Sequence, residues 1–217
     1  HLHSDHITDL NDVITSAWIA TFAEQEPLQI VGPPGTKEVV DRLLHFLSFD
    51  IKYRIDHHED LNEPPAVNVT EIESGVVELK GDVKISTELT DHHPVGPTIA
   101  FRFDHGNDAV VVAGDTIPCA GLDKLCTGAK GLVHTVIRKD IIESIPLQRL
   151  QDVCDYHSSV EEASQTAERA GIETLVFTHY VPAFPSGQEE EWEKIAAQHF
   201  SGRIELGDDL HRVEIGE

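Results

Sequence analysis

Residues 1–6 read His1-Leu2-His3-Ser4-Asp5-His6, a segment with three imidazoles and one carboxylate and no cysteine. This is the ligand set that a hard or borderline divalent metal prefers. In an extended segment His1 and His3 project to the same side, and a turn after Ser4 would bring Asp5 and His6 round to a second ion. The alternative is a purification-tag remnant or a solvated cluster, and the interposed Leu, Ser and Asp argue against it.

The composition is that of an ordinary globular protein, but the charge is not. The chain has 217 residues, enough for one large-core domain or two small ones, with 40% hydrophobic and 25% charged residues. Its formal net charge is −23, and its 16 Lys and Arg residues are scattered. Such a surface repels phosphates. We therefore expect no large nucleic-acid ligand.

Cysteine usage and hydropathy bear on the compartment. The chain has three cysteines, an odd number without zinc-finger spacing, which favours idle thiols in a reducing compartment. No apolar run reaches the length of a membrane span, and no signal peptide is visible. We expect a cytoplasmic protein that does not engage a membrane. Because a ligand loop needs a rigid element before it, we expect a single domain over residues 1–217 that is incomplete at its N-terminus.

The first part of the chain predicts helices alternating with short strands. Helical spacing covers residues 10–22, with Thr8 or Asp9 as the cap. A strand over 28–32, a helix to about Leu47 and a strand over 51–55 predict a right-handed βαβ unit. The turn at residues 32–36 lacks the Gly-Lys-Ser/Thr ending of a phosphate-binding loop, so we interpret it as a connector.

From residue 66 onward the apolar period becomes two, which predicts an antiparallel meander. Further strands are predicted at residues 98–103, 109–113, 131–133, 174–178, 203–206 and 211–215, and helices at 160–170, with Ser158 or Ser159 as its cap, and at 188–200. Polar side chains stand where these predicted strands stop. They are His92, Asp115, His134 and His179, with His157 ahead of the helix at 160–170.

The ordered set of motifs resembles the metallo-β-lactamase superfamily. The set is His-x-His-x-Asp-His at residues 1–6, then His92, then Gly114-Asp115-Thr116, then His179. Within the superfamily the chain is most similar to the ribonuclease Z branch and its phosphodiesterase and arylsulfatase relatives. The resemblance implies an α/β fold, an αββα sandwich whose N-terminal strands the sequence lacks, and two zinc ions at one edge, with Mn²⁺ or Fe²⁺ as alternatives.

The resemblance also implies roles for individual residues. His92 is preferred over His93 because family members place the ligand directly after the position of Asp91. Tyr156-His157-Ser158-Ser159 resembles the His-Ser-Thr segment whose imidazole meets the scissile phosphate. The implied catalytic residues are Asp5, His157 and His134, and the implied metal ligands are His1, His3 and His92 for one ion, Asp5, His6 and His179 for the other, and Asp115 for both.

Three departures from ribonuclease Z concern the substrate. The segment beginning at His134 reads His-Thr-Val-Ile instead of His-Glu-Ala-Thr, so the Glu that orients a catalytic histidine is absent. His179 is followed by Tyr-Val-Pro rather than a Ser-Ser-Arg-like tail. The interval from His92 to Asp115 is short, whereas transfer-RNA processing enzymes carry a protruding arm there. With the acidity, these departures favour a small anionic ester as the substrate.

The predicted function is therefore hydrolysis by a pair of metal ions. Two ions about 3.5–4 Å apart lower the pKa of a shared water towards about 7, which provides a nucleophile at neutral pH. We expect a phosphodiesterase acting on a small phosphodiester, and a homodimer. The alternatives are an arylsulfatase or lactonase-type hydrolase, 3′ processing of precursor transfer RNA, and a metal-binding module without catalysis.

Overall fold

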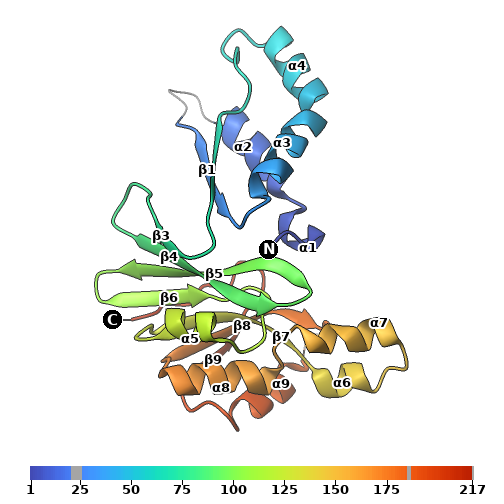
Figure 1. The fold of residues 1–217 in the computed structure, drawn as a ribbon, viewed down its shortest axis with the longest axis vertical. Helices are drawn as coiled ribbons and strands as arrows, with labels where there is room; N and C mark the ends of the chain where they lie inside the picture. Colours follow the sequence, from blue (N-terminus) through green and yellow to red (C-terminus); the bar gives the residue numbers. More distant parts are fainter. Residues whose placement is uncertain (21–25, 185–186, 217) are drawn as a thin grey trace. The chain divides into compact units, whose positions relative to one another are not determined.

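The structure is a computed structural model that describes residues 1–20, 26–184 and 187–216 (Figure 1). It divides into two compact units, His1–Ile72 and Glu73–Glu217. The single domain over 1–217 stays a prediction. Among the described residues, none of the helices combines the length and the apolar character that a bilayer crossing requires.

The first unit holds a parallel pair of strands together with helices. Leu28 pairs with Val67 at one end of the strand pair, and Gly32 pairs with Glu71 at the other. The elements in chain order are α1 (Ser4–Ile7), α2 (Leu10–Ile19), β1 (Leu28–Gly32), α3 (Thr36–Phe46), α4 (Ser48–His57) and β2 (Val67–Glu71). The predicted helix over 10–22 is α2, with Asp9 at its N-cap, and the predicted positions from 21 onward lie outside the described residues.

The strand predicted at 51–55 is wrong, because these residues belong to helix α4. Ile51 and Ile55 stand four positions apart, a spacing that suits one face of a helix as well as a short strand. Ion pairs at the same spacing support the helix, with 2.8 Å between Nε of Arg54 and Oδ2 of Asp50 and a second pair between Lys52 and Asp56. The strand that completes the parallel unit with β1 is β2.

The second unit is built on a seven-stranded sheet with the order β3-β4-β5-β6-β7-β8-β9 among its described residues. Strands β3 to β6 pair antiparallel, as the predicted meander requires, and β6 to β9 pair parallel. The strands are β3 (Gly75–Val77), β4 (Lys84–His92), β5 (Val95–His105), β6 (Asp108–Val112), β7 (Gly131–Ile137), β8 (Thr174–Val181) and β9 (Arg203–Leu206). The meander prediction was wrong for residues 67–71, which form β2 in the other sheet.

Helices cover one face of this sheet and form the main core with it (Figure 1). Leu122 of α5, Ala163 of α8 and Trp192 of α9 are buried in the same cluster as Leu132 and Phe177 of the strands. The helical elements of this unit are α5 (Ala120–Cys126), α6 (Lys139–Glu143), α7 (Gln148–Gln151), the 3₁₀ helix η1 (Asp152–Asp155), α8 (Val160–Ala170) and α9 (Glu189–Ala196).

The prediction of α8 is confirmed in its bounds and in its cap. The Ser159 hydroxyl accepts a hydrogen bond from the Glu162 backbone N–H at 3.2 Å, and the Glu162 carboxylate accepts one from the Ser159 backbone N–H at 2.9 Å. The last predicted strand, over 211–215, is wrong, because that segment makes no strand pairing in the described structure. His211 instead closes a turn onto the Asp208 carbonyl, and its successors run beside a cavity.

Candidate metal centre

The opening hexapeptide folds so that its imidazoles gather. His3 lies at the N-cap of α1, the short helix that provides the predicted turn after Ser4. The His1 ring centroid lies 4.7 Å from that of His3 and 4.3 Å from that of His6. The Asp5 carboxylate lies 3.5 Å from Nε2 of His6. Within the first unit, the structure therefore brings the four predicted metal-binding residues of residues 1–6 into one locality.

In the second unit, a buried carboxylate stands at the centre of a group of imidazoles. Asp115 is 1% exposed and follows β6 through Gly114, whose φ of 64° is in the left-handed region that favours glycine. Its Oδ2 lies 3.4 Å from Nε2 of His157 and 3.9 Å from Nε2 of His179. His92, Asp115 and His157 each offer a ligand atom, and these atoms all lie within 4.8 Å of one another.

Backbone carbonyls fix which ring nitrogen faces this group. Nδ1 of His92 lies 2.7 Å from the Tyr156 carbonyl, and Nδ1 of His157 lies 3.0 Å from the Val153 carbonyl. Because a carbonyl oxygen can only accept, Nδ1 carries the proton in both rings and the neutral form offers its Nε2 lone pair. His92 is 1% exposed, whereas the competing His93 is exposed. The geometry therefore favours His92 over His93 as a member of the group.

His92 and His179 both lie where the strand register shifts by one residue. Between Thr135 and Ile137 of β7, the partner strand β8 advances from Thr178 to Val181, so β8 carries an extra residue at His179 or Tyr180. A similar shift follows Thr90 in the β4–β5 pairing, next to His92. A β-bulge re-aims side chains and is common beside active sites. His179 also has φ 53°, an uncommon value for a residue other than glycine.

His134 lies inside β7 rather than at the strand end where the sequence placed it. It is fully buried, and its Nδ1 lies 2.7 Å from the Thr135 carbonyl. Its Nε2 has no hydrogen-bond partner among the described residues. Burial lowers the pKa of His134 to about 4, against a weaker opposite effect of the Thr135 carbonyl. Burial therefore disfavours the imidazolium form of His134, which is the form that a general acid needs.

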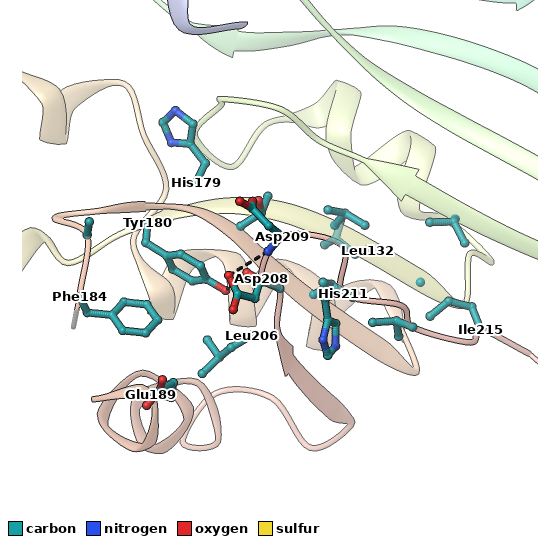
Figure 2. A pocket seen from close by; sticks show the side chains of 18 residues that line it. Leu132, His179, Tyr180, Phe184, Glu189, Leu206, Asp208, Asp209, His211 and Ile215 are labelled. Atoms are coloured by element: carbon teal, nitrogen blue, oxygen red, sulfur yellow. Dashed lines mark hydrogen bonds between the residues drawn. The ribbon is translucent and has the colours of Figure 1, made fainter. Parts of the chain in front are cut away.

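A cavity of about 820 Å³ borders His179 in the second unit. Figure 2 shows Leu132 and Leu206 on its sheet side, Tyr180 and Phe184 at one end and Ile215 at the other. Its polar lining includes the acidic residues Glu189, Asp208 and Asp209, together with Thr178, His179, Tyr180 and His211. Sequence reasoning missed this cavity because its lining strand residues have the same apolar pattern as the core.

The chain matches a known family over most of its length. The family model described as a β-lactamase superfamily domain matches residues 1–180. A ribonuclease Z of Mycobacterium avium (strain 104) is 60% identical over 216 residues, covering 99% of this chain and 77% of that protein. A putative ribonuclease Z of Mycobacterium tuberculosis (strain CDC 1551 / Oshkosh) is 56% identical, covering 99% of this chain and 96% of that protein.

Solved structures with the same fold confirm the predicted fold class. The metallo-β-lactamase fold protein YhfI of Bacillus subtilis matches with a TM-score of 0.68 and 20% identity, over 96% of this chain and 72% of that one. The short form of human tRNase Z matches with a TM-score of 0.68 and 18% identity, over 100% of this chain and 77% of that one. The α/β sandwich of the metallo-β-lactamase type is therefore the fold of this chain.

The expectation of a small anionic ester as substrate, with no large nucleic-acid ligand, is wrong. The relatives at 56–61% identity bear the name ribonuclease Z, which specifies a nucleic-acid substrate for them. The physical error lies in the use of charge, because the net charge of −23 describes the whole chain, whereas an approaching phosphate responds to the local field. The short interval between His92 and Asp115 is not evidence against a nucleic-acid substrate either, because these relatives named ribonuclease Z align with this chain over 216 residues that include the interval.

The fold, the relatives and the buried ligand-type residues agree on the chemistry. They imply divalent metal ions and a hydrolase that acts on phosphodiester bonds. The chain belongs to the β-lactamase superfamily and, within it, to the ribonuclease Z family.

Proposed function

We propose that this chain is a dinuclear zinc ribonuclease that processes the 3′ side of precursor transfer RNA. The observation that carries the proposal is the buried Asp115 carboxylate facing Nε2 of His157 and of His179, in a chain 60% identical to a ribonuclease Z. Precursor transfer RNA is the substrate that resemblance to ribonuclease Z implies. The cytoplasm, where such a substrate would be met, stays the predicted location.

The residues present fit a divalent metal. His92 and His157 both direct Nε2 inward, because each Nδ1–H is bonded to a backbone carbonyl. Imidazole nitrogen and carboxylate oxygen are the ligand atoms of catalytic zinc sites, and the carbonyl partners are the kind of outer contact that fixes a ligating ring. A carboxylate 1% exposed is also costly to bury as a charge, and a divalent cation offsets that cost. Zinc is the proposed metal, with Mn²⁺ or Fe²⁺ as alternatives.

The proposed ligand set rests on the order of the motifs along the sequence and on the resemblance to the family. The set is His1, His3 and His92 for one ion, Asp5, His6 and His179 for the other, and Asp115 for both.

The chain's own residues divide the remaining work. When bound, two such ions supply an acidified water as nucleophile and offset the charge that develops on the phosphate. His157 is the residue we place at the leaving oxygen, because its ring is held by the Val153 carbonyl with Nε2 directed at the site. His134 is not the proton donor in this proposal, because its burial disfavours the protonated ring.

The test uses the purified protein with a precursor transfer RNA that carries a 3′ trailer. Cleavage should be lost after removal of metal with a chelator and should return when zinc is added. His92→Ala should abolish cleavage and remove the zinc ion that His92 would hold, whereas the exposed neighbour His93→Ala is the matched control and should retain cleavage and both ions. Equal effects of the two substitutions would contradict the proposed site, and zinc-loaded protein that leaves the precursor intact would contradict the function.

A further inference from the structure

Two buried hydroxyl groups, those of Thr116 and Ser158, hydrogen-bond to the backbone beside His92 and Asp115. Thr116 follows Asp115 in the sequence and is fully buried. Its Oγ1 accepts a hydrogen bond from the Asp91 backbone N–H at 3.1 Å. The same oxygen lies 3.0 Å from the Asp91 carbonyl and 2.8 Å from the Ile117 carbonyl, either of which can accept its proton. The Thr116 hydroxyl therefore links Asp91, which precedes His92, to the segment that follows Asp115.

A backbone hydrogen bond also connects the segments of Asp91 and Thr116. The Ile117 N–H donates to the Asp91 carbonyl at 2.8 Å, so Asp91 and Ile117 form an isolated antiparallel bridge. The bridge alone would hold the two segments at one point. With the Thr116 hydroxyl added, both the N–H and the carbonyl of Asp91 are held, and the orientation of the adjacent His92 backbone is fixed as well as its distance.

A second hydroxyl connects the His157 segment to the same place. Ser158 is fully buried, and its Oγ donates to the Thr116 carbonyl at 2.7 Å. The Ser158 carbonyl in turn accepts from the Ile137 N–H at 3.1 Å, which anchors the segment to the end of β7. Tyr156, on the other side of His157, accepts a hydrogen bond from the His92 ring through its carbonyl. Each of the segments around His92, Asp115 and His157 is therefore hydrogen-bonded to the other two.

We propose that Thr116 and Ser158 are positioning residues whose hydroxyls hold the backbone beside His92 and Asp115, two of the proposed metal ligands, and thereby set the affinity for metal. The inference rests on the proposed function, since it assumes that these residues serve a metal-dependent reaction. Neither hydroxyl touches the ligand atoms, so each acts through the backbone of its neighbour. Removing a residue that holds a metal ligand in place typically lowers the affinity for the metal about 10–100-fold, and we expect an effect of this size.

Thr116→Val and Ser158→Ala test the inference in the full chain. Valine keeps the shape of threonine but leaves the Asp91 N–H without its acceptor, and Thr116→Ser restores the hydroxyl. The matched control is Thr166→Val, because Thr166 is also fully buried and its Oγ1 donates to the Glu162 carbonyl at 2.9 Å inside α8. Zinc affinity is measured by competition with a chromophoric chelator, and the Tm of each metal-free variant is measured in parallel.

Thr116→Val and Ser158→Ala should each weaken zinc binding about 10–100-fold, while Thr116→Ser should stay within about threefold of wild type. Thr166→Val should lower the Tm without changing zinc affinity. Affinity for Thr116→Val equal to that for Thr166→Val would overturn the inference. A wild-type protein that binds zinc but does not cleave the precursor would overturn the proposed function, and the zinc affinities of the variants would still test the role of Thr116 and Ser158. A wild-type protein that binds no zinc would overturn both proposals.

Discussion

Asp115 and His157 face each other in the second unit, with 3.4 Å between the carboxylate Oδ2 and the imidazole Nε2, and both residues are almost fully buried. The Val153 carbonyl holds the His157 ring with Nε2 directed at this carboxylate, so a proton carried on Nε2 would lie where a leaving oxygen can receive it. His157→Ala should therefore slow single-turnover cleavage of precursor transfer RNA by about 10²–10⁴-fold. Bound zinc, measured by elemental analysis, should stay at the wild-type level, because His157 is outside the proposed ligand set. Loss of zinc together with activity would show that His157 is a ligand instead.

Asp115→Asn should have opposite effects on metal binding and on the stability of the metal-free chain. An amide cannot replace a carboxylate shared by two ions, so zinc binding and cleavage should be lost. Without metal, however, the wild-type carboxylate is a charge held at 1% exposure, which opposes folding. Urea unfolding of the metal-free proteins should show the variant to be at least as stable as wild type. A metal-free variant clearly less stable than wild type would mean that Asp115 holds the fold together by itself.

The free energy of unfolding should decrease as the pH is lowered, because burial lowers the pKa of His134 in the folded chain. Its imidazole has a pKa of about 4 in the folded chain and an ordinary value of 6.5 when unfolded. Between these values the unfolded chain takes up a proton that the folded chain resists, so the stabilisation is complete above pH 6.5 and is lost as the pH falls towards 4. From pH 7 to pH 5 the metal-free protein should lose roughly 2 kcal/mol through this residue.

Urea unfolding at the two pH values measures this loss. Carboxylates contribute to the same drop, so the informative quantity is the difference between wild type and His134→Asn. The exposed His105→Asn is the control and should retain the wild-type drop. A His134→Asn protein with the full wild-type drop would show that this imidazole is not held neutral.

Replacing Gly114 should displace Asp115 and weaken zinc binding, in addition to lowering the stability of the fold. Its φ is 64°, and an added Cβ would meet nothing within 4 Å, so Gly114→Ala is strained only through its backbone. Gly128 has φ 68° and equally open surroundings, and it follows helix α5 in the chain. Both alanine variants should lose about 1 kcal/mol in urea unfolding. Only Gly114→Ala should also weaken zinc binding, and an equal affinity in the two variants would argue against a special role for this turn.

Local signals explain which elements the sequence could predict. Helix α8 carries its own start signal in the Ser159 and Glu162 pair and its own stop at Gly171, which lies in the left-handed region. The strand wrongly predicted at 51–55 had only two isoleucines four apart to support it, and the Asp50–Arg54 pair was the overlooked helical signal.

The candidate site was predictable in residue type but not in geometry. Asp115 stands directly after an apolar run, so its place at the end of β6 followed from the pattern. The bulge at His179 and the interior position of His134 in β7 depend on pairing between strands far apart in sequence, which no local pattern encodes. The hydroxyl contacts of Thr116 and Ser158 depend on the same long-range packing.

The most direct test of the central claim is cleavage of a precursor transfer RNA by the purified protein as a function of bound zinc. We expect release of the 3′ trailer in proportion to zinc content, loss of cleavage on chelation and recovery on addition of zinc. A protein that carries its full complement of zinc and leaves the precursor uncut would show that this chain is not a zinc-dependent transfer-RNA processing enzyme.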